Sequence, residues 1–448
     1  MNLQRLFTRE RTRGLVAVAL AIGVSGVFKG AAFARESFIA ARFGLSPVTD
    51  AYFALQQFPI TLASYVYGAF ALAFVPAYAK AQKSGGPRWL SGFVVWALLG
   101  GFMLTVVMIA SGPVLIRALH MTESSDVRTT LSLLSFCFAP VVMTGFWAAI
   151  CTAKGRNLWA LSMSGFPYLF MTVALVALFA MGKLNNTSLP LSMTLGFLIV
   201  GLYSLVCVLR VTGLTDIRLM FWRDKEFKQF IRQLSASSVE NLGFAGNQLL
   251  IVYFLSKTGT GYISGNSCAM RIAMLGYTLL GMPLSQLVQA KLCTATDAGR
   301  RAVFQHWIIV VGILMVVSSS LLILGRFPII RLVYMHGKFQ AAAVHLVATL
   351  LVPWIAYVAV TSLNALPARY LFIANRGASY LRNQMIAYVA ANLIRYFVAG
   401  RLSVEWIIWC SVVAEGCSFL FSLSLCLTHE LSKDLQAAPK FAVLTEIA

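Results

Sequence analysis

The apolar residues of this chain fall into long blocks, and this pattern constrains its fold more than any other feature. Each block runs for about 20 residues, the length that crosses a ~30 Å hydrocarbon layer as a helix. Strands of an outer-membrane barrel would instead alternate over ~10 residues. Hydrophobic residues make up 59% of the chain and charged residues only 11%, whereas a soluble domain carries about 25% charged residues. The sequence therefore excludes a soluble enzyme and predicts an all-α polytopic membrane protein.

Twelve blocks are long enough to cross a membrane. They run roughly over 14–34, 48–78, 90–112, 130–152, 158–182, 189–210, 233–256, 264–290, 304–327, 344–368, 382–400 and 404–428. The second block contains Pro59 and Pro76, and the tenth contains Pro353 and Pro367. Proline in a membrane helix frees a carbonyl that neighbours or water must satisfy, so it often marks a bend beside a cavity.

The basic residues predict the orientation of these spans. The chain has 36 Lys and Arg against 15 Asp and Glu, a net charge of +21. Basic residues are roughly twice as numerous in the loops on the side of the two termini, which is typical of cytoplasmic loops. We therefore expect both termini in the cytoplasm and membrane lipids around the spans. Topology accounts for the charge, and nucleic-acid binding is not needed to explain it.

Two parts of the chain resemble each other. The segment PVLIRALHM (113–121) follows the third block, and PIIRLVYM (328–335) follows the ninth, with Arg and Met at the same spacing. Pro140 and Pro353 lie at a closely similar offset in the fourth and tenth blocks. An offset of six spans preserves orientation, so the pattern indicates a parallel repeat of two six-helix halves.

The repeat predicts three regions. We expect an N-terminal six-helix lobe over 1–211, a cytoplasmic basic linker over 212–232, and a C-terminal six-helix lobe with a short cytoplasmic tail over 233–448. Two lobes around one axis leave a cavity between them, a geometry typical of alternating access.

Charged residues within or beside the spans are candidate functional residues, because a charge in the membrane is costly and rarely incidental. The group comprises Lys29, Arg35, Arg42, Asp50 and Arg271. A cluster of cations with few acids favours an anionic ligand, and the forked donors of arginine match phosphate oxygens. Alternatively, Arg35, Arg42 and Asp50 lie at the membrane interface, with Arg35 paired to Glu36.

Glu415 lies in the middle of the last apolar block. It could carry a proton, bind a cation or remain a neutral structural residue. We therefore expect transport to be coupled to H⁺, Na⁺ or the membrane potential, with no bound cofactor. The chain shows no catalytic motif, and its Cys and His residues form no cluster with metal-ligand spacing, so neither a catalytic nor a metal site is predicted.

Three segments resemble one known family. They are FKGAAFARESFIAARFGLSPVTDAYF (28–53), GAFALAFVP (68–76) and YMHGKF (334–339). They are similar to the MurJ/MviN lipid II flippases, within the multidrug/oligosaccharidyl-lipid/polysaccharide (MOP) exporter superfamily. The resemblance implies the two-lobe MATE-like fold and a central cavity that receives a lipid-linked pyrophosphate sugar. It assigns Arg35, Asp50 and Arg271 to that cavity, with Lys29 in support.

This sequence differs from the family's pattern in two places. The stretch 61–68 lacks the arginines and the glutamate that the family would place in the second helix, and no glutamate follows Arg271 after one turn. The expected substrate is therefore an undecaprenyl-pyrophosphate-linked saccharide, either lipid II or a polysaccharide repeat unit. A cation-coupled multidrug exporter of the same superfamily is the alternative. Both would be bacterial inner-membrane transporters rather than enzymes, and cell-wall or polysaccharide synthesis enzymes are the expected protein partners.

Overall fold

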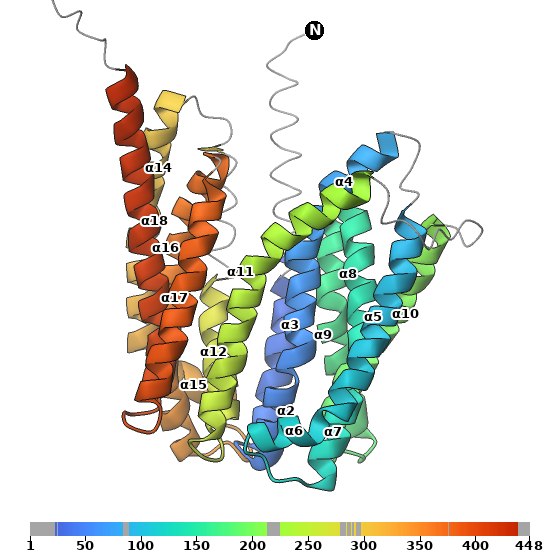
Figure 1. Ribbon diagram of the computed structural model, residues 1–448. Helices are drawn as coiled ribbons and strands as arrows, with labels where there is room; N and C mark the ends of the chain where they lie inside the picture. The colour runs from blue at the N-terminus through green and yellow to red at the C-terminus, as the bar shows by residue number, and fades with distance from the viewer. Residues whose placement is uncertain are drawn as a thin grey trace, which may run out of the picture. The chain divides into compact units, whose positions relative to one another are not determined.

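The computed structural model describes most of the chain as α-helix. The described residues are 23–24, 26–83, 89–212, 225–277, 297–374 and 376–437, with 284, 288, 291 and 292. They contain no strand, and eight helices within them are long and apolar enough to cross a membrane. Each of the twelve predicted spans overlaps a helix in this part of the chain (Figure 1). The prediction of an all-α polytopic membrane fold is confirmed.

The helices divide into two compact units by their contacts. The first unit comprises 1–268 and 327–348, and the second comprises 269–326 and 349–448. The predicted lobe boundary near 212–232 stays a prediction, and much of that linker lies outside the described residues.

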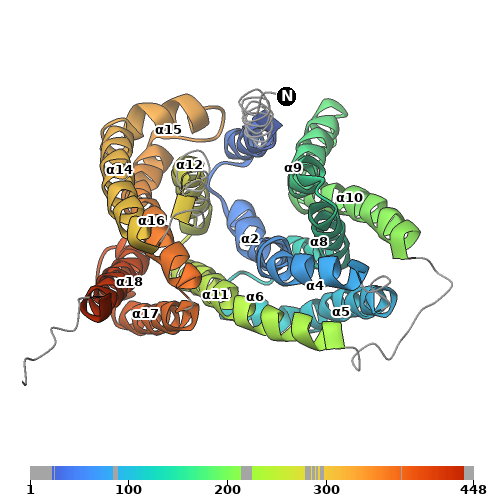
Figure 2. The same ribbon diagram turned by 90° about the horizontal axis from the view of Figure 1, so that it is seen from above.

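The first unit is built from a helix over residues 26–43 and the helices that follow it. These are α2 (Pro47–Leu55), α3 (Gln57–Tyr65), the π-helical η1 (Val66–Phe70), α4 (Ala71–Lys83), α5 (Leu90–Ala110), α6 (Gly112–Ala118), α7 (Ser125–Ser135), α8 (Phe138–Ala153), α9 (Asn157–Ala180), α10 (Ser188–Thr212) and α11 (Lys225–Ser256). The first turns of α12 (Tyr262–Gly276), most of α15 (Arg326–Tyr334) and the start of α16 (Ala341–Ile373) also belong to it. Figure 2 shows α8, α9 and α10 side by side.

The second predicted span is not one straight helix. Ser46 caps the start of α2 and Pro47 occupies its first turn, as expected for a helix N-terminus. The chain stays in the helical region at Gln56, between α2 and α3, and passes through η1 before α4. π-Helical turns inside helices are frequent at functional sites. The sequence did not indicate this π-helical turn, and the bend expected from the prolines stays a prediction.

Aromatic packing and small residues hold the first unit together. Phe70 lies 4.6 Å from Phe146, and Trp89 lies 5.5 Å from Phe230, between ring centroids. Elsewhere the helices meet at a glycine: a Cβ on Gly101 of α5 would lie 2.7 Å from the backbone of Ala139 in α8. Such close approach through small residues is typical of membrane helix pairs, which gain little from the hydrophobic effect.

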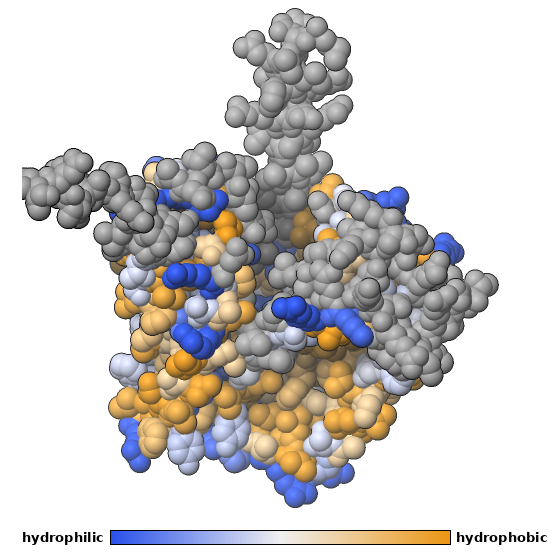
Figure 3. All heavy atoms as spheres, turned by 45° about the horizontal axis from the view of Figure 1, so that its top comes forward, coloured by the Kyte–Doolittle hydropathy of each residue, from blue (hydrophilic) through white to orange (hydrophobic). Residues whose placement is uncertain are grey.

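The second unit contains the C-terminal part of α12, α14 (Asp297–Leu324), the greater part of α16, α17 (Gly377–Val398) and α18 (Trp406–Ala437). Only 11% of the most apolar window of α14 is buried, so its outer face suits lipid rather than water. Figure 3 shows hydrophobic residues over much of the helical surface in view, with hydrophilic residues gathered along its lower margin.

Candidate functional site

The predicted cation Arg35 lies on the helix over 26–43 and is 1% exposed. Its Nη2 lies 2.5 Å from Oε1 of Glu36, and its Nη1 donates to Sδ of Met171 in α9 at 2.7 Å. The ring of Tyr168, also in α9, lies 5.7 Å from the guanidinium carbon. Arg35 is thus paired with Glu36, and its predicted binding of the head group stays a prediction. A buried charge needs such a partner, because its lost hydration must be replaced.

Asp50 lies on the first turn of α2 and binds the start of α12. Its carboxylate accepts hydrogen bonds from the backbone N–H of Gly261 at 2.5 Å, the backbone N–H of Ser264 at 2.8 Å and the Ser264 hydroxyl at 2.7 Å. The first N–H groups of a helix have no partner within it and carry the positive end of its dipole. Asp50 therefore caps α12 from another helix. The family-based assignment of Asp50 to a substrate cavity stays a prediction.

The glycines before α12 make this cap possible. Gly259 and Gly261 have φ angles of +135° and +90°, a region that side chains disfavour. The chain thereby turns sharply between α11 and α12 and directs the Gly261 N–H at the carboxylate of Asp50.

Two of the segments that carry the family resemblance contact each other. Ser37 donates to the carbonyl of Val333 at 2.5 Å, and the backbone N–H of Lys338 donates to the carbonyl of Ala41 at 2.8 Å. Between them, Gly337 has φ +60°, and a Cβ there would lie 2.3 Å from the Ala41 oxygen. Glycine is required at 337 for both reasons, so this contact explains part of the YMHGKF motif.

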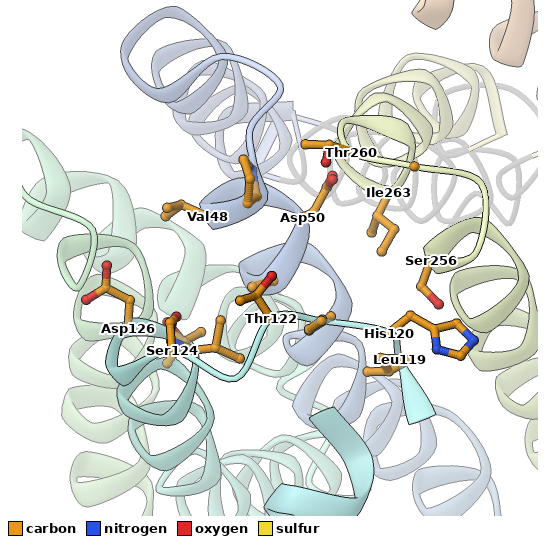
Figure 4. Close-up of a pocket in the computed structure, with 16 residues that line it drawn as sticks. Val48, Asp50, Leu119, His120, Thr122, Ser124, Asp126, Ser256, Thr260 and Ile263 are labelled. Carbon is orange, nitrogen blue, oxygen red and sulfur yellow. Dashed lines mark hydrogen bonds between the residues drawn. The ribbon is translucent and has the colours of Figure 1, made fainter. Parts of the chain in front are cut away.

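A cavity of about 250 Å³ opens beside Asp50 (Figure 4). Its lining comes from α2, the segment joining α6 to α7, and the segment joining α11 to α12: Pro47, Val48, Asp50, Ala51, Leu119, His120, Met121, Thr122, Ser124, Asp126, Val127, Thr130, Ser256, Gly259, Thr260 and Ile263. Figure 4 shows Asp50 beside Thr260, and His120 near Ser256. Two carboxylates line this cavity, so it suits a hydroxyl-rich or cationic group better than an anion.

The remaining predicted cations differ in their surroundings. Lys29 is exposed on the helix that carries Arg35. Arg42 is also exposed, and its guanidinium carbon lies 4.1 Å from the centroid of the Phe179 ring, a cation–π contact. Arg271 is half-buried on α12 and belongs to the second unit. Its predicted grouping with Arg35 stays a prediction.

Glu415 is buried in the second unit, where α16, α17 and α18 supply polar partners. Its Oε1 accepts from Nε2 of Gln384 at 2.8 Å and from the Tyr388 hydroxyl at 2.6 Å. Its Oε2 accepts from Nδ2 of Asn364 at 2.9 Å. The Ser418 hydroxyl donates to Oε1 of Gln384 and completes the cluster. The carboxyl is 2% exposed, and every partner is buried.

A second buried charge in this unit was not among the predicted site residues. Arg395 on α17 is fully buried, and its guanidinium donates to three neutral oxygens. These are the Ile407 carbonyl, the Ser411 hydroxyl and the Asn392 side chain. Asn392 in turn donates to the Tyr388 carbonyl. The signal was present in the sequence: polar residues at 384, 388, 392 and 395 recur at helical spacing along one face of α17.

These helices and buried charges define a polytopic membrane protein with the fold of the MOP transporters. A solved structure described as "Lipid II flippase MurJ, inward closed conformation" shares the fold with a TM-score of 0.76 and 18% identity over 91% of this chain and 87% of that one. An inward-facing MATE family multidrug resistance transporter of the MOP superfamily shares the fold with a TM-score of 0.74 and 13% identity. The match covers 92% of this chain and 99% of that one.

Sequence comparison identifies the family. The model of the family described as "Lipid II flippase MurJ" matches residues 39–445, so the chain belongs to this family. The probable lipid II flippase MurJ of Rhizobium meliloti is 25% identical over 69% of this chain, and the lipid II flippase MurJ of Burkholderia cenocepacia is 25% identical over 70%. These matches span 61% and 64% of the relatives' own lengths.

Proposed function

We propose that this protein is a flippase for an undecaprenyl-pyrophosphate-linked saccharide, with lipid II as the first candidate and a polysaccharide repeat unit as the second. The match of the MurJ family model over residues 39–445 carries this proposal. The protein would work in the bacterial inner membrane with both termini in the cytoplasm. It would act as a transporter rather than an enzyme, and the polyprenyl tail would stay in the lipid while the head group crosses.

Arg35 is proposed to bind the pyrophosphate of the head group. The carboxylate that it contacts in the structure is that of Glu36. A pyrophosphate offers more oxygens and more negative charge than that carboxylate, and it matches the forked guanidinium donors. The head group would therefore displace Glu36 from Arg35. Lys29, exposed on the same helix, would add positive charge, and Arg271 would contribute from the second unit.

Asp50 would act on conformation rather than on the substrate. It ties α2 to the first turn of α12 through three hydrogen bonds. In this account two six-helix lobes alternate in access to the two sides of the membrane. The Asp50 cap would hold one of the two states closed, and its release would accompany opening.

A depletion experiment tests the substrate assignment. A host strain in which this chain is depleted should accumulate lipid II if the protein serves peptidoglycan synthesis. Accumulation of another lipid-linked saccharide would assign it to surface polysaccharide. Synthesis enzymes of the corresponding pathway would then be its functional partners. No accumulation of either, together with loss of resistance to organic cations, would instead support the multidrug exporter.

A further inference from the structure

The side chain of Glu415 lies within the apolar span of α18 without a cation beside it. The ion pairs between described residues are Arg35–Glu36 and Arg128–Glu123, and neither includes Glu415. Its partners are instead the amide of Asn364 on α16 and, on α17, the amide of Gln384 and the phenol of Tyr388. A carboxylate in a membrane span without a counter-ion is a functional feature by default, because its charge has lost its hydration.

The geometry around the carboxylate decides which ion it can take. Every group that contacts its oxygens is a donor: Nδ2 of Asn364, Nε2 of Gln384 and the hydroxyl of Tyr388. A metal cation such as Na⁺ would need several ligand oxygens directed at one point. Here N–H and O–H groups occupy those directions. The site is thus poorly suited to a metal ion, whereas a proton needs only one carboxylate oxygen and one acceptor.

The acceptor is present in Asn364. Its Oδ1 is buried and has no hydrogen-bond partner among the described residues, although Nδ2 of the same amide donates to Glu415 at 2.9 Å. A half-turn of the amide exchanges these two atoms. In the rotated form a protonated Glu415 would donate its O–H to Oδ1 of Asn364. The rotated form also gives up the hydrogen bonds of Nδ2 to Oε1 of Gln384 at 3.2 Å and to the Ser418 hydroxyl at 3.3 Å, so the amide rotates only when Glu415 carries a proton.

We propose that Glu415 and Asn364 form a proton-binding site that couples transport to proton movement. The coupling rests on the proposed flippase function, whereas proton binding does not. The carboxylate would take a proton from water on one side and release it on the other, with Asn364 rotating between its two hydrogen-bonded forms.

Two tyrosines are among the described residues that interact with Glu415. Tyr357 on α16 and Tyr388 on α17 interact electrostatically with Glu415. Arg395 lies further along α17, where it interacts with Tyr357 and is linked to Tyr388 through Asn392. Protonation of Glu415 would make the net charge of this cluster more positive by one elementary charge. That charge would respond to the membrane potential.

Infrared spectroscopy of the full chain in phospholipid vesicles tests proton binding directly. The wild type should show a protonated-carboxyl band that grows as the pH falls, and Glu415→Gln should remove it. Glu123→Gln is the control, because it removes a partly exposed acid and should leave the band unchanged. Tyr388→Phe removes a hydrogen-bond donor from the carboxylate, so it should enlarge the band at a given pH. Persistence of the titrating band in Glu415→Gln, or its absence from the wild type, would overturn the proposal.

Transport measurements then test the coupling. In vesicles containing a polyprenyl-pyrophosphate saccharide, a pH gradient should change the head-group transfer rate several-fold for the wild type and for Glu415→Asp, but not for Glu415→Gln. Replacement of Na⁺ by K⁺ should leave the rate unchanged. A rate that follows Na⁺ instead of the pH gradient would overturn the coupling. If the wild type moves no head group, the flippase proposal fails, while the infrared result still decides whether Glu415 binds a proton.

Discussion

The carboxylate of Asp50 caps the first turn of α12 through the backbone N–H and the hydroxyl of Ser264. The two residues are 214 positions apart in the chain. A helix cap supplied by a distant helix can be released, since its loss frees the start of the capped helix without altering the helix itself.

Removal of this cap should weaken the first unit. Asp50→Ala leaves two N–H groups and one hydroxyl without their acceptor, and we expect a loss of about 1–2 kcal/mol in the free energy of unfolding. Thermal unfolding in detergent measures this loss. Asp126→Ala is the control, because Asp126 lines the same cavity but pairs only with Asn186 at the surface. An equal effect of the two substitutions would contradict the cap.

Glu36→Gln should destabilise the protein strongly. It leaves the guanidinium of Arg35 buried without its carboxylate, a change that costs about 3–5 kcal/mol in buried pairs. Glu123→Gln breaks the exposed pair with Arg128, whose side chains are 34% and 65% exposed, and should cost at most about 1 kcal/mol. Denaturation of both variants in the same detergent provides the comparison. Similar losses would mean that Arg35 is hydrated in solution.

Gly337→Ala should lower the stability of the protein by more than the strain of a positive φ angle alone. Gly337 and Gly155 both have positive φ, +60° and +72°, but nothing lies within 4 Å of a Cβ at 155. Alanine at either position pays the strain of the left-handed region, about 1 kcal/mol. Alanine at 337 must also displace the Ala41 carbonyl. A larger drop in unfolding temperature for Gly337→Ala is expected, and equal drops would argue against the contact between residues 41 and 337.

Arg395→Ala should leave a cavity lined by the Ile407 carbonyl, the Ser411 hydroxyl and the Asn392 side chain. Each acceptor left without a donor costs about 1–3 kcal/mol. Low concentrations of methylguanidinium should restore part of the lost stability, because that ion can reproduce the missing donors. Arg401→Ala removes an exposed arginine, so it should lose little stability, and methylguanidinium should not change that stability. A lack of rescue would contradict the assigned hydrogen bonds.

The sequence predicted the helices better than the contacts between them. Runs of apolar residues as long as the membrane is thick are a local signal, so the twelve spans overlap observed helices. The π-helical turn at Val66–Phe70 has a weaker local signal, because it depends on how the neighbouring helices pack.

Charge identifies candidate site residues in the sequence, but the sequence does not show which residues they contact. Asp50 and Arg35 stood out because charged residues are rare in apolar spans. Their partners Ser264 and Met171 lie 214 and 136 positions away, and nothing in the local sequence marks them. Arg395 was overlooked for a different reason: it lies near the end of a predicted span, where an arginine can reach the interface, yet the structure buries it.

Arg35 and Arg271 are proposed to hold the anionic head group during transfer. The most direct test is the double variant Arg35→Ala/Arg271→Ala in vesicles that contain a polyprenyl-pyrophosphate saccharide, with head-group exposure detected by a probe that cannot cross the membrane. Arg128→Ala, which removes an exposed arginine, is the control. Measured below its own thermal transition, the double variant should lose nearly all transfer while the control keeps it. Transfer at the wild-type rate in the double variant would contradict the account.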